Sequence, residues 1–307
     1  MTNTLGHVAV SASFDPTARA QGKLVYLSEA EQLRAADTQG LYQGFTFALN
    51  PDAAQDCAEI CASARSLGFS QLRGIVSGIE LCDSSTTAQS TAALIRCLKL
   101  AVELGMHQVF CVAQEWPAGS RDADFDCDIL PPFVKNVQAA LQAVPGVTEF
   151  GVEPLIPVEQ QHVNTLAKAR SLADACNQAL GVRRVYPVPD LAHLFGLVER
   201  TRWDDITNQL IEAIQAGEVP YAHLSVPESR TDQFLTAIAA GDLPERAVRT
   251  LRKVPCVDTE AFDPNDRFLD DLRRLVPRFE SADPSGWTEG KRFERFVETA
   301  QYFQELP

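Results

Sequence analysis

The sequence has no long hydrophobic run. None of its 307 residues lies in a stretch of about 18 uncharged apolar residues, so we expect no transmembrane helix. The first residues, "MTNTLGHVAV", lack the basic segment and apolar run of a secretory signal, and we expect none. With 45% apolar residues, the chain has enough apolar side chains for a large globular core. These features together predict a cytoplasmic globular protein.

Positive charge and paired cysteines are also scarce. The 27 basic residues face 41 acidic ones, and the net charge of −14 disfavours nucleic acid and anionic membranes as partners. None of the eight cysteines stands in a Cys-x-x-Cys pair or at zinc-finger spacing. We therefore expect reduced thiols, as in a cytoplasmic protein, and a small molecule as the partner.

Two common nucleotide-binding signatures are absent. No Gly-x-Gly-x-x-Gly follows the first predicted strand and no P-loop occurs, which leaves a doubly wound sheet without support. Instead, eight short apolar runs alternate with helical segments, and this order predicts parallel strands joined by crossover helices. The size and number of units predict a (β/α)8 barrel. The predicted strands are 7–14, 42–49, 72–79, 107–113, 149–155, 184–190, 221–226 and 255–262.

Helix start and stop signals lie between these strands. The segment 52–69 begins with an aspartate and ends at a glycine, as helices commonly do. The segments 87–105, 157–181 and 202–217 have the same form. Residues 1–285 would then form the catalytic barrel. Residues 286–307, rich in aromatic side chains, would form a helical extension that packs on the barrel or on a partner subunit.

Acidic residues and one of the five histidines stand at the ends of the last four predicted strands. They are Glu153, Asp190, His223 and Glu260. In a (β/α)8 barrel these ends meet at the carboxyl face, where active sites lie. Side-chain alternation allows Glu153 and Glu260 both to point into the barrel mouth. Three carboxylates and an imidazole repel one another without a cation, and a site so rich in oxygen favours Mn²⁺, Mg²⁺ or Co²⁺ over a structural zinc.

Four segments around these residues share a pattern with one family. They are "VEPLIPVEQQHVNT" (152–165), "DLAH" (190–193), "HLSVPESR" (223–230) and "TEAF" (259–262). In this order they resemble the xylose-isomerase-like barrels, and within them most nearly the tagatose and psicose (allulose) 3-epimerase type. The resemblance covers roughly residues 149–262.

The resemblance implies a metal-dependent isomerase or epimerase. One divalent ion, Mn²⁺ in the first place, with Mg²⁺, Co²⁺ or Zn²⁺ as alternatives, would be held by Glu153, Asp190, His223 and Glu260. It would chelate a ketose, whose deprotonation gives an enediolate. Glu153 and Glu260 would be the catalytic acid and base, and the two together would invert a carbon atom.

The resemblance also implies three substrate-binding residues. His193 and Arg230 would donate hydrogen bonds to the carbonyl or enediolate oxygen, and Glu159 would accept one from a hydroxyl group. Ile156 and Pro157 replace an Asn-Arg pair of the epimerase pattern. Three further departures are the segment after Arg230, the segment after strand four, and the first strand, which lacks the aromatic residue that often lines the sugar pocket in this family. Since such loops select the substrate, its exact structure and phosphorylation state stay open.

Other functions use the same kind of barrel. A dehydratase or lyase acting on a keto-sugar or keto-inositol would begin with the same deprotonation. A non-catalytic sugar-binding barrel is a second alternative, although it does not need four ionisable groups converging in its mouth. A DNA-repair nuclease of this fold needs further histidines after strands three and four, and the sequence has none there. The aromatic extension makes a homodimer or homotetramer an expectation.

Overall fold

Eight parallel strands form the centre of the molecule. The computed structural model describes residues 4–9, 16–113, 123–155, 162–195, 198–225, 244–260 and 289–305, with Glu260 described in its backbone alone. The strands are neighbours in the order β6-β5-β4-β3-β2-β1-β8-β7, which is the chain order wrapped around a ring. They are β1 (Thr4–Val8), β2 (Tyr42–Ala48), β3 (Gln71–Val76), β4 (Gln108–Val112), β5 (Glu149–Glu153), β6 (Val185–Pro187), β7 (Tyr221–Ser225) and β8 (Cys256–Glu260).

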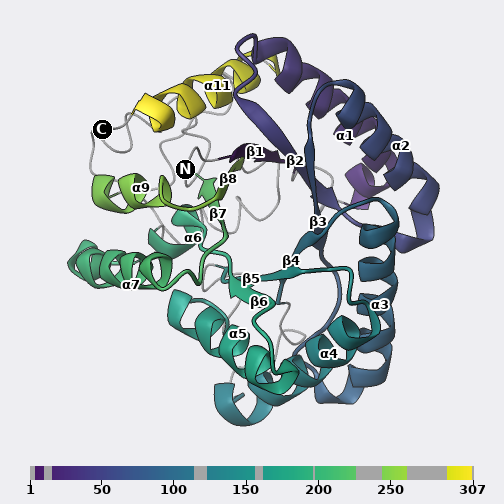
Figure 1. Cartoon of the computed structure of the whole chain (residues 1–307), viewed down its shortest axis with the longest axis vertical. Coiled ribbons are helices and arrows are strands. Elements are labelled where there is room, and N and C mark those ends of the chain that lie inside the picture. Colours follow the sequence, from purple (N-terminus) through teal and green to yellow (C-terminus); the bar gives the residue numbers. More distant parts are fainter. Residues whose placement is uncertain are drawn as a thin grey trace.

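Helices surround this ring of strands (Figure 1). Within the part of the chain that the structure describes, none of them is both long and apolar enough to cross a membrane. The α-helices are α1 (Pro16–Ala36), α2 (Ala54–Ser66), α3 (Thr87–Glu103), α4 (Leu130–Ala143), α5 (Leu166–Leu180), α6 (Leu191–Phe195), α7 (Trp203–Gln215), α9 (Glu245–Leu251) and α11 (Glu289–Glu305). Short helical turns are η1 (Pro51–Ala53), η2 (Ser84–Thr86), η3 (Phe125–Ile129) and η4 (Arg200–Arg202).

The ring closes between β6 and β7. Just beyond β6, Asp190 forms an isolated parallel bridge with His223 of β7. The backbone N–H of His223 donates to the carbonyl of Pro189 over 2.9 Å. The strands therefore form a closed parallel barrel, and the predicted (β/α)8 fold is confirmed. The closing contact is made by two of the predicted site residues.

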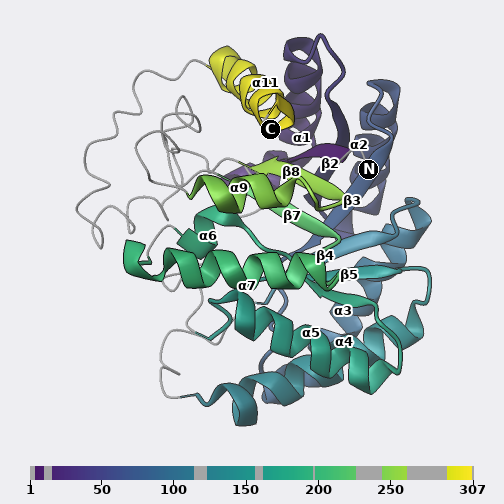
Figure 2. The ribbon, with the colours of Figure 1, turned by 60° about the vertical axis from the view of Figure 1, so that its left-hand side comes forward.

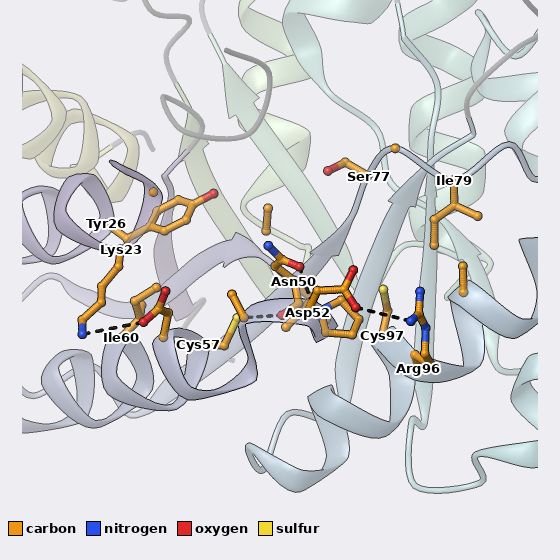
Figure 3. Close-up of a pocket in the computed structure, with 18 residues that line it drawn as sticks. Lys23, Tyr26, Asn50, Asp52, Cys57, Ile60, Ser77, Ile79, Arg96 and Cys97 are labelled. Atoms are coloured by element: carbon orange, nitrogen blue, oxygen red, sulfur yellow. Dashed lines mark hydrogen bonds and ion pairs between the residues drawn. The ribbon is translucent and has the colours of Figure 1, made fainter. Parts of the chain in front are cut away.

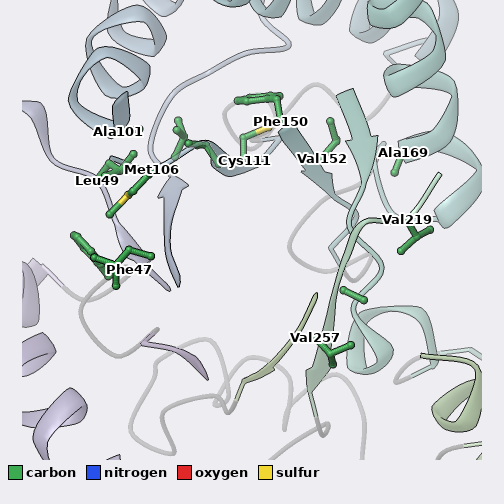
Figure 4. Close-up of a cluster of buried hydrophobic side chains, with 14 of the residues drawn as sticks. Phe47, Leu49, Ala101, Met106, Cys111, Phe150, Val152, Ala169, Val219 and Val257 are labelled. Carbon is green, nitrogen blue, oxygen red and sulfur yellow. The ribbon is translucent and has the colours of Figure 1, made fainter. Parts of the chain in front are cut away.

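The outer face of the barrel is apolar. Along each strand, alternate side chains point toward the helices and are buried there, as in β2, where Phe45 and Phe47 are fully enclosed. Figure 4 shows part of this layer, including Phe47, Cys111 and Phe150. Burial of this continuous apolar layer between strands and helices is the main source of stability of the fold.

The starts of two elements differ most from the sequence-based prediction. The first strand begins at Thr4, three residues before the predicted start. Helix α5 begins at Leu166 rather than 157, because the Thr165 side chain caps it by accepting from the N–H of Lys168 over 3.2 Å. The predicted stop at Gly181 is confirmed, where a left-handed backbone (φ 71°) ends the helix.

Helix α11 lies within the predicted aromatic extension. It packs against α1, beside which it runs in Figure 2. The hydroxyl of Tyr42 donates to the carbonyl of Phe296 over 2.8 Å, and the ring of Phe296 lies 4.7 Å from that of His7. The helix thus covers the barrel beside β1 and β2. The division at residue 286 and a role of the extension in oligomers stay predictions.

Candidate metal centre

Four predicted site residues come together at the carboxyl ends of β5, β6 and β7, which are adjacent in Figure 1. Glu153 is the last residue of β5, Asp190 follows β6, and His223 is the middle residue of β7. His193 lies in the short helix α6. All four side chains are buried, with at most 5% of each residue exposed. Their charged or polar ends are therefore removed from bulk water.

The Asp-x-x-His spacing has a local structural basis. Oδ1 of Asp190 accepts a hydrogen bond from the N–H of His193 over 3.0 Å, so the aspartate caps the first turn of α6. Its other oxygen, Oδ2, lies 3.9 Å from Nδ1 of His193. One turn of helix thus returns the imidazole to the side of the aspartate, and the spacing brings both groups to one place.

The polar atoms of the four residues are close enough to share one ion. Nδ1 of His223 lies 2.8 Å from Oε1 of Glu153 and 3.6 Å from Oδ2 of Asp190. Nδ1 of His193 lies 3.6 Å from the same Glu153 oxygen. One ligand atom each from Glu153, Asp190 and His193 lie within 4.8 Å of one another.

These separations fit a divalent cation. In an octahedral site with ligands about 2.1 Å from the ion, neighbouring ligands are about 3.0 Å apart and opposite ones about 4.2 Å apart. Carboxylate oxygen combined with imidazole nitrogen suits Mn²⁺, Co²⁺ and Zn²⁺, and a carboxylate-rich set also suits Mg²⁺. The residues present therefore fit a resident metal ion. We call Glu153, Asp190, His193 and His223 the acidic centre.

The structure describes the remaining predicted site residues only in part. The backbone of Glu260 ends β8 beside Ser225 of β7, so this residue stands at the same end of the barrel. Glu159 and Arg230 lie outside the described residues. The structure thus brings together Glu153, Asp190, His193 and His223, while the assignment of His193 to substrate and of the other three to metal stays a prediction.

A chain of buried polar groups lies behind the acidic centre, inside the barrel. Nε2 of His223 lies 2.8 Å from the hydroxyl of Tyr221, which donates to Oδ2 of Asp258 over 2.9 Å. The hydroxyl of Thr46 donates to the same oxygen over 2.6 Å. Nη1 of Arg73 donates to Oδ1 of Asp258 over 2.8 Å. Burial raises the pKa of Tyr221 well above its ordinary value, so the phenol keeps its proton.

Glycines make room for the buried Arg73–Asp258 pair. A Cβ atom on Gly44 of β2 would lie 2.5 Å from Nη1 of Arg73 and 3.1 Å from the Cα atom of Gly6. A Cβ atom on Gly6 of β1 would overlap Oδ1 of Asp258. Both strand positions therefore need glycine as long as the pair occupies the barrel interior.

The sequence-based interpretation missed this polar chain. It assigned no role to Asp258, to Tyr221 or to Arg73. The available signals were a charged arginine inside the apolar run "QLRGIV" and glycines inside two other strands. A buried charge in a strand requires a partner, and small residues on neighbouring strands indicate where it fits.

A separate cavity of about 410 Å³ lies between α1, α2, α3 and the ends of β2 and β3 (Figure 3). Near its wall the Asp52 carboxylate faces the Arg96 guanidinium at 3.3 Å. Cys57 and Cys97 also line it. No residue of the acidic centre does so, and the cavity is therefore a feature distinct from the candidate metal centre.

Comparisons with solved structures find this fold in sugar epimerases. The D-psicose 3-epimerase of Clostridium cellulolyticum H10, solved with D-tagatose, superimposes with a TM-score of 0.68 at 15% identity over 100% of both chains. An L-ribulose 3-epimerase gives 0.60 at 16% identity over 98% of this chain and 96% of the other. A 3-keto-D-glucoside 4-epimerase of E. coli gives 0.56 at 14% identity over 91% and 99%.

These neighbours establish the architecture over the whole chain. The fold is the parallel barrel that these epimerase structures share, as the sequence predicts. No family model matches the sequence, and no curated protein does. At such low identity the shared fold leaves activity and substrate to be argued from the acidic centre.

Proposed function

We propose that the protein is a divalent-metal-dependent isomerase or epimerase of a ketose or keto-sugar. One observation carries the proposal: two buried carboxylates and two imidazoles converge at the carboxyl end of a barrel. That end is where barrels of this class carry out their chemistry. Structural neighbours named as D-psicose and L-ribulose 3-epimerases support a ketose as the substrate class.

Glu153, Asp190 and His223 would hold the ion, with Glu260 as a fourth ligand from β8. A bound Mn²⁺ would act as a Lewis acid toward the substrate carbonyl and so acidify the neighbouring C–H bond. Mg²⁺, Co²⁺ and Zn²⁺ are the alternatives for the same ligands. We assign His193 to the substrate oxygen. Its ring nitrogen is also close enough to Glu153 to share a metal ion with it, and metal binding is therefore the competing assignment.

Glu153 and Glu260 would move the protons. They end β5 and β8, which are separated around the barrel by β6 and β7, so their carboxylates would approach a bound sugar from different sides. One would remove the proton next to the carbonyl, and the other would return a proton to the opposite face, which inverts the carbon. Glu159 and Arg230 would complete the sugar-binding residues.

The test is exchange of the substrate's α-proton with solvent. The Mn²⁺-loaded protein is incubated with D-psicose, D-tagatose and L-ribulose in deuterated water, and we expect deuterium at the carbon next to the carbonyl. Glu260→Gln should abolish this exchange. Glu245→Gln, on the exposed surface of α9, is the matched control and should keep it.

Other outcomes identify the alternatives. Full exchange in Glu260→Gln would remove this residue from the acid–base role. Loss of water or carbon–carbon cleavage of a keto-sugar would identify a dehydratase or lyase. Sugar binding by metal-free protein without any exchange would identify a non-catalytic barrel and contradict the proposal.

A further inference from the structure

The two nitrogens of the His223 ring face different surroundings. Nδ1 points to the acidic centre, at hydrogen-bond distance (2.8 Å) from Oε1 of Glu153 and 3.6 Å from Oδ2 of Asp190. A metal ion bound between Nδ1 and Glu153 would take the place of the hydrogen in that bond. Nε2 points away from it, to the hydroxyl of Tyr221 at 2.8 Å. A neutral imidazole carries its proton on one nitrogen only, and the group facing the other nitrogen decides which one.

The proton of Tyr221 is already directed elsewhere. The phenol has one hydrogen, and it is donated to Oδ2 of Asp258 over 2.9 Å. A carboxylate is a stronger acceptor than a neutral ring nitrogen, so this direction is the favoured one. The phenol oxygen can then only accept from the imidazole, and Nε2 of His223 must carry the hydrogen.

Three side chains donate hydrogen bonds to the carboxylate of Asp258, namely Tyr221, Arg73 and Thr46. Arg73, which stays charged in a protein interior, donates to Oδ1 over 2.8 Å. Thr46 donates to Oδ2 over 2.6 Å, next to the bond from Tyr221. All three contacts are donors, which is the arrangement that a carboxylate accepts. Its Arg73 partner balances the charge of this carboxylate inside the barrel.

We propose that Tyr221, backed by Asp258 and Arg73, is a positioning residue that keeps a hydrogen on Nε2 of His223 and thereby directs Nδ1 toward the metal ion as the ligand atom. This inference rests on the proposed metal centre. We further infer that the orientation of the His223 ring is set by a hydrogen-bonded chain that begins on the far side of the barrel. The chain runs from Arg73 of β3 through Asp258 of β8 to Tyr221 of β7. Such outer partners of metal-binding histidines set the orientation and basicity of the ligand.

The first test reads the tautomer directly. The protein is labelled with ¹⁵N-histidine, stripped of metal, and loaded with Zn²⁺, which is diamagnetic. The His223 signals are identified by their loss in His223→Asn. We expect one-bond coupling to hydrogen at Nε2 and none at Nδ1 in the zinc-loaded protein. A hydrogen on Nδ1 and a bare Nε2 would overturn the proposal, and this measurement needs no folded Tyr221 variant.

The second test measures metal affinity. Tyr221→Phe keeps the ring, which packs 5.5 Å from that of Phe110, and removes only the hydroxyl. We expect its dissociation constant for Mn²⁺, measured by isothermal titration, to rise by about 10- to 100-fold. Tyr42→Phe is the matched control. It also loses a buried phenol hydroxyl, but one bonded to Thr259 and Phe296, and its affinity should be unchanged.

The outcomes separate this inference from the proposed function. If the wild-type protein binds neither Mn²⁺ nor Zn²⁺, the metal centre itself is wrong. If it binds the ion while Tyr221→Phe binds it equally well, the centre stands and the positioning role of Tyr221 is wrong. An equal loss of affinity in Tyr42→Phe would attribute the effect to general destabilisation and likewise contradict the proposal.

Discussion

The two faces of the barrel differ in what they bury. The outer face packs residues such as Phe47, Phe150 and Val152 against the helices, and its contacts are mainly apolar. The inner face contains a small apolar cluster around Phe110, together with the ion pair of Arg73 and Asp258 and the polar groups that lead from it to the acidic centre. The outer face thus holds the apolar core of the fold, and the inner face holds a charged pair and the polar groups around the proposed metal centre.

Charge is distributed unevenly along the inner face. Deep in the barrel, Arg73 and Asp258 neutralise each other. At the carboxyl end, Glu153 and Asp190 are both acidic and lie close to two imidazoles. The deep pair needs no external ion, whereas the acidic centre would be stabilised by the cation that we propose. A buried charge with a partner of opposite sign therefore does not indicate a ligand site. Buried acidic groups that lie close together do.

The largest expected loss of stability comes from breaking the deep pair. Asp258→Asn leaves the Arg73 charge buried without an anion, and we expect the free energy of unfolding to fall by about 3–5 kcal/mol. Glu245→Gln removes one partner of the exposed Arg249 pair on α9 and should cost under about 1 kcal/mol. Urea unfolding of both variants measures this. Equal effects would contradict a large contribution of the Arg73–Asp258 pair to stability.

A smaller effect is expected from filling the space beside the pair. In Gly44→Ala the new methyl group meets Arg73 and the backbone of Gly6, and we expect a loss of about 1–3 kcal/mol. In Gly74→Ala the methyl group meets the flexible end of Leu49, which can move aside, so the loss should be smaller. Thermal unfolding of the two variants compares them. A greater loss in Gly74→Ala would contradict the account of why β2 carries a glycine.

The smallest effect is on the labelling rate of cysteines that are buried between strands and helices. It leaves stability unchanged. Burial raises the pKa of Cys61 and of Cys97 to about 11 and that of Cys176 to about 12. Since the thiolate is the reactive form, labelling at pH 8 should be slow at these residues and accelerate as the pH approaches these values. Exposed Cys127 should be labelled first. Mass spectrometry after iodoacetamide treatment checks the order, and early labelling of Cys176 would mean that the outer layer opens readily.

The sequence predicted the barrel well because the strands are short apolar runs, and residues that start or stop helices lie between them. The strands from β2 onward begin within one residue of their predicted starts. The first strand was misplaced because "VAVSASF" continues the apolar pattern beyond Val8, so composition alone could not fix its register. The predicted start of helix α5 was too early. A threonine can also stand inside a helix, and only its hydrogen bond to the N–H of Lys168 shows that Thr165 caps this one.

The acidic centre was partly predictable for a different reason. Glu153 ends β5, Asp190 follows β6 and His223 lies within the short strand β7, so barrel geometry alone brings them together. The link from His223 through Tyr221 to Asp258 was not predictable, because it depends on which atoms of three inward side chains meet across β7 and β8. Alternation gives the face on which a side chain lies but not its hydrogen-bond partner.

The most direct test of the central claim is the number of divalent ions that bind per chain. Metal-stripped protein is titrated calorimetrically with Mn²⁺, and the same is done with Asp190→Asn and with the Glu245→Gln control. The account predicts one ion per chain in the wild-type protein and the control, and binding that is lost or strongly weakened in Asp190→Asn. Unchanged binding in Asp190→Asn, or no binding in the wild-type protein, would contradict it.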